Sequence, residues 1–251
     1  MPDLLTQALA FDGLAWVILA AFVAGIVRGF SGFGTALIYL PIAAQFMPPI
    51  WAIVTLASMD LLGPAPNIPA AVRNGHPRDL MRLLCGAAVM LPVGLWVLGR
   101  TDPEVFRYGV SVLALVMLAI LLTGVRYRGR VTRTMVYGLG GAGGFLGGAV
   151  GLPGPPVILF YMASPHGAGV IRANTMAFLF FFDLMLVALL AVLGRLETLP
   201  FVGGLALTVP AMAGNLLGAW LFHPRYEKIY RSVAYLLIAL AALSGLPFVH
   251  S

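Results

Sequence analysis

The segment VRGFSGFGTALIYLP, residues 27–41, places an arginine beside closely spaced small residues. A guanidinium donates several hydrogen bonds to an oxyanion, and glycines allow backbone N–H groups to approach a ligand closely. These residue types therefore fit the recognition of a small anion. The candidate binding residues in this segment are Arg28, Gly29, Ser31, Gly32, Gly34 and Thr35.

A second segment of the same kind, GGAVGLPGPPVILFY, occupies residues 147–161. Sliding the sequence by 119 residues superposes Gly29 on Gly148 and Gly32 on Gly151. We expect a new helix to begin after each break, at about Thr35 in the first and at Pro155 or Pro156 in the second, because proline suits the first helical position. Each helix start carries free N–H groups and partial positive charge, which favours an anion. Gly151 and Gly154 are therefore candidate substrate contacts as well.

Further polar residues interrupt the apolar segments. Asn67 in GPAPNIPA, and Asn174 and Thr175 in RANT, are candidate hydrogen-bond donors to an oxyanion. TLASMDLL and FLFFFDLM correspond once a short insertion is allowed, and this places Asp60 against Asp183. These two carboxylates are candidate proton carriers, with structural pairing to arginines as the alternative.

The composition indicates a lipid environment. Hydrophobic residues make up 61% of the 251 residues and charged residues only 10%, against about 25% charged in soluble domains. The mean hydropathy is +0.98. The chain is therefore predicted to be an all-α polytopic membrane protein. Cys85 is the single cysteine, so no disulfide within the chain and no thiolate metal cluster is expected, and no cofactor is predicted.

Apolar segments long enough to cross a bilayer need roughly 20 residues. Two broken pairs are expected at 14–27 with 35–47 and at 134–151 with 156–164, each forming a re-entrant or doubly crossing hairpin. Full spans are predicted at about 50–72, 83–99, 105–125, 173–194, 199–222 and 232–249.

The basic residues predict the orientation of these spans. They gather in connections at 73–82, 126–133 and 223–231, which the positive-inside rule places in the cytoplasm. Both termini are then periplasmic. The single membrane domain, residues 1–251, is predicted to contain two inverted repeats, at about 12–125 and 132–249. Inverted repeats with interrupted helices are typical of secondary transporters, whose substrate site lies near the bilayer midplane.

The two breaks, and the Ala-containing helices PIWAIVTLASMD and GVIRANTMAFLFF after them, resemble the sulfite exporter TauE/SafE family over nearly the whole chain. The resemblance implies a transporter of the bacterial inner membrane that moves sulfite, sulfoacetate or a related sulfur-containing anion. The chain departs from the family's GxGGG run by carrying Phe33 and Thr35 in the first break and three prolines in the second.

Other interpretations are weighed against this one. A passive anion channel could use the same helix ends, and proton-coupled uptake of an organic anion is a further alternative. A serine hydrolase is disfavoured because the GFSG segment at 29–32 has no mid-span histidine to activate Ser31. The glycines are alternatively packing positions, and Arg172 is expected to be an interfacial anchor. A homodimer is left open, the lipid bilayer is an expected partner, and no nucleic-acid partner is predicted.

Overall fold

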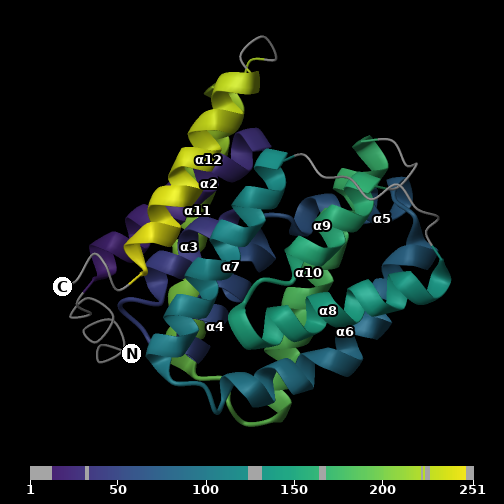
Figure 1. Ribbon diagram of the computed structural model, residues 1–251, viewed down its shortest axis with the longest axis horizontal. Coiled ribbons are helices and arrows are strands. Elements are labelled where there is room, and N and C mark those ends of the chain that lie inside the picture. The colour runs from purple at the N-terminus through teal and green to yellow at the C-terminus, as the bar shows by residue number, and fades with distance from the viewer. Residues whose placement is uncertain are drawn as a thin grey trace. The chain divides into compact units, whose positions relative to one another are not determined.

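The computed structural model describes residues 13–31, 34–123, 132–163, 168–221, 223 and 227–246. This part of the chain is helical and contains no strand, which confirms the predicted all-α class (Figure 1). The elements in chain order are α2 (Leu14–Ser31), α3 (Thr35–Ala43), α4 (Pro49–Leu62), the 3-10 helix η1 (Ala65–Asn67), α5 (Ile68–Asn74), α6 (Pro77–Leu98), α7 (Pro103–Thr123), α8 (Arg133–Val150), α9 (Gly154–Ala163), α10 (Ala168–Val192), α11 (Thr198–Leu221) and α12 (Glu227–Ser244).

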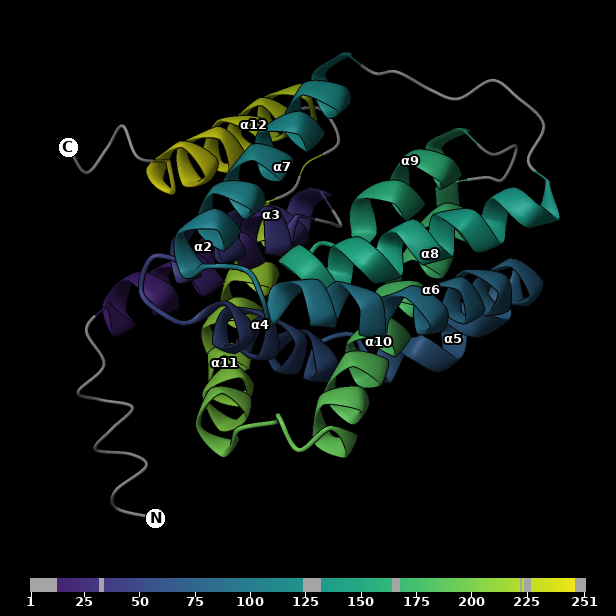
Figure 2. The same ribbon diagram turned by 60° about the horizontal axis from the view of Figure 1, so that its bottom comes forward.

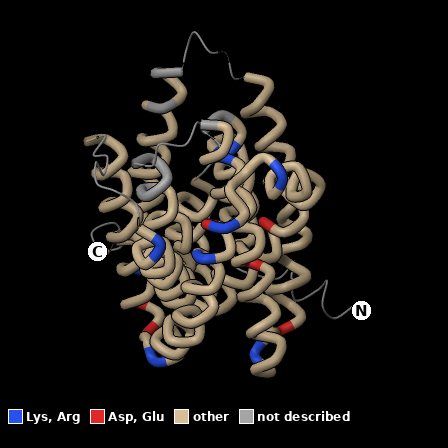
Figure 3. Tube along the Cα trace, turned by 90° about the vertical axis from the view of Figure 1, so that its right-hand side faces the viewer, with Lys and Arg blue, Asp and Glu red and all other residues tan. Residues whose placement is uncertain are grey.

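Four of these helices, α6, α7, α10 and α11, are long and apolar enough to cross a membrane. Shorter apolar helices occupy Leu14–Gly29, Pro49–Leu62 and Ser232–Ser244. Charged residues occupy few positions along the trace, as Figure 3 shows. These features support a multi-pass membrane protein.

The predicted continuous span at 50–72 is wrong. Helix α4 ends at Leu62, and the chain passes through η1 into the short helix α5. The cause is the sequence GPAPNIP, residues 63–69, which contains three prolines. Proline has no N–H to continue a helix and disfavours helical backbone in the residue before it.

Other helix ends also differ from the prediction. Helix α6 begins at Pro77, before the predicted residue 83, because proline suits the first helical position. Asp79 and Arg82 pair within its first turns at 2.6 Å. Helix α10 begins at Ala168 instead of residue 173. The charged and polar residues that suggested a span end therefore lie inside helices that extend beyond the apolar segment.

The chain forms two compact units, and each combines helices from both halves of the sequence. The first unit takes its described residues from 1–59, 102–119 and 197–251, and the second from 60–101 and 120–196. In the first unit the most extensive packing joins α2 to α11, and in the second it joins α6 to α8. Figures 1 and 2 both show α6 and α8 side by side.

Glycines permit both of these close helix pairs. A Cβ added at Gly29 of α2 would lie 2.3 Å from the Asn215 carbonyl oxygen of α11. A Cβ at Gly144 of α8 would lie 2.5 Å from the Ala87 carbonyl oxygen of α6. Because lipid supplies no hydrophobic drive between helices, small residues that let backbones approach stabilise such pairs. Gly29 therefore has the helix-packing role that was the alternative interpretation of the glycines.

Candidate functional site

The first break lies in the first unit, where α3 begins at Thr35, as predicted, and α2 ends at Ser31, beyond the predicted residue 27. Gly34 immediately precedes α3 with φ 102°, and as a glycine it offers no side chain to cap the helix start. Glycine adopts this left-handed backbone without the steric cost that a Cβ adds. The first four N–H groups of a helix have no partner within it, and at α3 these positions, 34–37, all carry an N–H.

Arg28 brings a full positive charge to this helix start. It lies in the last turn of α2, half-buried, and its Nη1 donates a hydrogen bond of 3.4 Å to Thr35 Oγ1. Thr35 is buried, with 4% of its surface exposed. The guanidinium therefore adds to the partial positive charge of the α3 N-terminus. This arrangement can stabilise a small anion.

Three buried polar side chains near the first break, Tyr39, Thr55 and Thr208, were not predicted from the sequence as site residues. Tyr39 lies one turn after Thr35 on α3, is fully buried, and donates a hydrogen bond of 2.8 Å to Thr55 Oγ1 of α4. Thr208 of α11 in turn donates to the Met59 carbonyl oxygen at 3.2 Å. The spacing of Thr35 and Tyr39 by four residues could have shown that they share one face of α3.

The second break lies in the second unit and offers few donors. Helix α8 ends at Val150, Gly151 follows with φ 73°, and α9 begins at Gly154, one or two residues before the predicted prolines. The stretch from Gly151 to Pro155 is buried. Three of the four positions at this helix start, 153–156, are prolines. Only Gly154 therefore supplies a backbone N–H there.

Asn174 is the most suggestive of the remaining candidates. It is 1% exposed on α10, and its Oδ1 accepts a hydrogen bond of 2.8 Å from the His76 N–H. This bond determines which end of the amide is oxygen. The Nδ2 group is buried and has no hydrogen-bond partner among the described residues. Asn174 thus keeps two N–H donors available, which fits its predicted contact with an oxyanion.

The structure does not bring all predicted residues together. Asn67 is exposed before α5 with no capping bond, and Thr175 is half-buried within α10. Asp60 and Asp183 are half-buried on α4 and α10, and each has a polar partner. The Ser31 side chain and Gly32 lie outside the described residues. Because the two breaks belong to different units, their approach to one shared anion stays a prediction.

The described residues contain no group of three or more His, Cys, Asp or Glu side chains that could hold a metal ion. Arg172 is exposed on α10, which is compatible with its predicted role as an anchor.

Comparison of the sequence with known protein families gives a match. The model of the sulfite exporter TauE/SafE family matches residues 17–245. The chain matches no curated protein and no solved structure. The matched range includes both helix breaks and all four long apolar helices. The chain therefore belongs to the sulfite exporter TauE/SafE family of membrane transporters.

Proposed function

We propose that this transporter exports a small sulfur-containing anion, such as sulfite or an organosulfonate. Membership of the sulfite exporter family supports the substrate class. The observation that carries the proposal is the hydrogen bond from Arg28 to buried Thr35 at the start of α3, where Gly34 offers no capping side chain. A guanidinium can form charge-assisted hydrogen bonds with an oxyanion, and N–H groups that have no partner within their helix can donate to the same oxyanion.

The first break is the principal anion site in this proposal. Arg28 supplies the charge, Gly34 and Thr35 supply N–H groups, and Gly29 allows α2 to reach this position against α11. Asn174 is the strongest further candidate because its buried Nδ2 group has no partner among the described residues. Contacts from Ser31, Gly32, Asn67, Gly151, Gly154 and Thr175 remain proposals that rest on the sequence.

Export is the favoured direction on energetic grounds. Moving one negative charge out of a cell that is negative inside gains about 2.3 kcal/mol per 100 mV. Export can therefore run without a coupling ion, whereas uptake would have to overcome the same free energy of moving the charge against the membrane potential. We place the protein in the bacterial inner membrane with both termini periplasmic, as the arginine-rich connections predict. Cysteine labelling from each side tests this topology, which termini on opposite faces would contradict.

Proton coupling is proposed to depend on Asp183 more than on Asp60. Asp183 has no basic residue within ten positions in sequence, whereas Asp60 is proposed to pair with Arg28. We expect Asp183→Asn to lose the response of anion flux to an imposed pH gradient and Asp60→Asn to retain it. Flux measured in proteoliposomes with and without the gradient checks this, and a full response in Asp183→Asn would refute the proton role.

The deciding experiment for the function uses purified protein in liposomes. Sulfite, sulfoacetate and sulfate are compared under an imposed membrane potential and an imposed pH gradient. A carrier is expected to show saturable flux and exchange of labelled for unlabelled sulfite. Linear flux without exchange would favour the passive channel, and no flux of any sulfur anion would overturn the proposed substrate class.

A further inference from the structure

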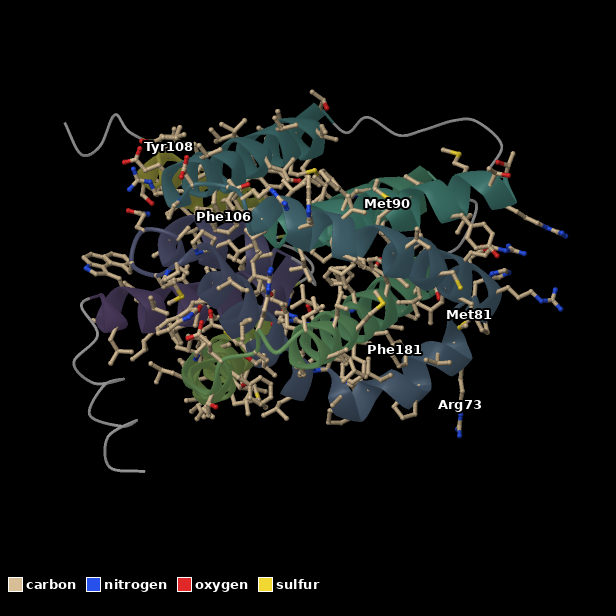
Figure 4. The ribbon with its side chains drawn as sticks, turned by 90° about the horizontal axis from the view of Figure 1, so that it is seen from below. Arg73, Met81, Met90, Phe106, Tyr108 and Phe181 are labelled. Carbon is tan, nitrogen blue, oxygen red and sulfur yellow. The ribbon has the colours of Figure 1, made fainter. Side chains whose placement is uncertain are left out.

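Arg107, in the first unit, carries a positive charge that nothing in the proposed site uses. It lies near the Pro103 end of α7, between Phe106 and Tyr108, which Figure 4 labels. Its Nη2 donates a hydrogen bond of 3.2 Å to the Tyr108 hydroxyl, and the guanidinium lies 5.1 Å from the Tyr108 ring centroid. The Nε group is buried and has no acceptor within the described chain. Nη2 of the guanidinium is therefore held by Tyr108, while Nε has no hydrogen-bond partner among the described residues.

Among the described residues, no carboxylate forms an ion pair with Arg107. Asp102 and Glu104 precede it on the same end of α7, and both are exposed. The described carboxylate of Asp79, on α6, pairs with His76 and Arg82. Arg107 takes part in neither pair. A half-buried guanidinium without a counter-charge is costly at the edge of a bilayer. Such a charge favours an anionic ligand.

Ser111 lies one helical turn beyond Arg107, on the same face of α7. It is 0% exposed, and its Oγ has no hydrogen-bond partner among the described residues. A Cβ added at Gly245, just after α12, would lie 2.3 Å from this oxygen. The end of α12 therefore approaches the Ser111 hydroxyl as closely as only a glycine permits.

Polar groups of two other helices meet at the same end of the unit. Gln45, just after α3, donates from Nε2 to the Pro41 carbonyl oxygen at 2.8 Å and to Ser244 Oγ of α12 at 3.1 Å. The Pro41 carbonyl oxygen would in turn lie 3.2 Å from a Cβ at Gly245. These bonds join the end of α3 to the end of α12, and Gly245 brings the end of α12 close to Ser111 of α7. The surroundings of Ser111 are thus an ordered polar cluster inside an apolar unit.

We propose that Arg107 and Ser111 form a second oxyanion-binding position, at the Pro103 end of α7. Arg107 offers a charged N–H donor at Nε and Ser111 offers a hydroxyl donor, and neither of these two atoms has a hydrogen-bond partner among the described residues. An oxyanion can accept both bonds and supply the counter-charge, whereas water can supply only the bonds. On the predicted topology this end of α7 is periplasmic, where the positive-inside rule does not favour an arginine. The oxyanion is either a soluble sulfur anion or the phosphate of a lipid headgroup.

The test uses the purified full-length protein in an Arg28→Gln background, so that binding at the first break does not contribute. Sulfite, methanesulfonate and inorganic phosphate are titrated, and the midpoint of thermal unfolding is measured. We expect the anions still to raise this midpoint. We expect Arg107→Gln to increase their apparent Kd about 10-fold to 100-fold, as for loss of a charge-assisted hydrogen bond. The same proteins are compared in nanodiscs of phosphatidylcholine with and without phosphatidylglycerol. A soluble occupant predicts no effect of phosphatidylglycerol, whereas a lipid occupant predicts stabilisation that Arg107→Gln removes.

Ser111→Ala separates loss of ligand binding from loss of folding. Removing a buried hydroxyl that has no partner should leave the unliganded protein equally or more stable, while the anion or lipid response weakens. Ser58→Ala is the matched control, because Ser58 is also fully buried but donates to the Val54 carbonyl oxygen at 2.6 Å. It should lower stability and leave the response intact. Arg100→Gln, which removes an exposed arginine stacked on Trp96, should also leave it intact.

The proposal is overturned if neither soluble anions nor phosphatidylglycerol stabilise the Arg28→Gln protein, or if Arg107→Gln and Ser111→Ala respond like their parent. This outcome is independent of the proposed function, which is judged by sulfite flux through protein that retains Arg28.

Discussion

The first and second breaks occupy matching places in the two halves of the chain, yet they present different chemistry at the start of a helix. At the first break all four leading positions carry an N–H, and Arg28 donates to Thr35 beside them. At the second break three of the four positions are prolines, and the segment from Gly151 to Pro155 is buried. Both helix starts carry the partial positive charge of aligned peptides, but only the first can donate many hydrogen bonds.

This difference teaches that two breaks with similar composition need not contribute equally to one site. Proline shapes a helix start by restricting φ and removes the donor at the same time. The second break is therefore a rigid, donor-poor helix start, whereas the first is charged and donor-rich. We infer that an anion depends mainly on the first break, and the following changes test that asymmetry.

The largest effect is expected for Arg28→Ala. Loss of a charge-assisted hydrogen bond of about 1.5 to 3 kcal/mol should weaken sulfite binding roughly 10-fold to 100-fold. The matched control is Arg172→Ala, which removes an exposed arginine of α10 and should change binding little. Binding to purified protein and flux in proteoliposomes measure both. Equal behaviour of Arg28→Ala and the wild type would make Arg28 a structural residue and end the asymmetry.

An intermediate effect is expected from alanine at Gly34, which immediately precedes α3, and at Gly154, which begins α9. Gly34→Ala forces a Cβ into left-handed backbone at φ 102°, which should cost about 1 to 2 kcal/mol of stability. Gly154→Ala should leave stability unchanged or slightly higher, because its Cβ would meet Ile158 and Leu179 at an ordinary 3.5 Å. Denaturation of the two variants compares them directly. A larger loss for Gly154→Ala would show that the second break is the more constrained of the two.

The smallest effect is expected from giving the second break its missing donors. The double variant Pro155→Ala and Pro156→Ala restores two N–H groups at the start of α9. Each change should cost about 0.4 to 1 kcal/mol of stability through the greater entropy of the unfolded chain. If an anion reaches this helix start, the double variant should bind sulfite a few-fold more tightly, as calorimetry can measure. Unchanged affinity would place the anion at the first break alone.

The helical membrane fold class and several helix boundaries could be predicted from the sequence. Low charge and high hydropathy determined a helical membrane protein, because only helices satisfy every backbone group within a segment in lipid. Gly34 and Thr35 marked the start of α3 by local backbone preference, and the GLPGPP segment marked the break before α9. The proline-rich 63–69 segment carried the signal that ends α4, although the apolar residues around it suggested one span.

Tertiary structure alone decided which helices pair and which polar groups lose their partners. The pairing of α2 with α11 and of α6 with α8 joins segments far apart in the chain, through glycines whose packing role depends on the facing backbone. The burial of Asn174, Ser111 and the Nε group of Arg107 likewise depends on neighbours contributed by other helices. Local sequence determines backbone preference and solvent class, whereas partner, burial and desolvation are set by side chains brought together only when the chain folds.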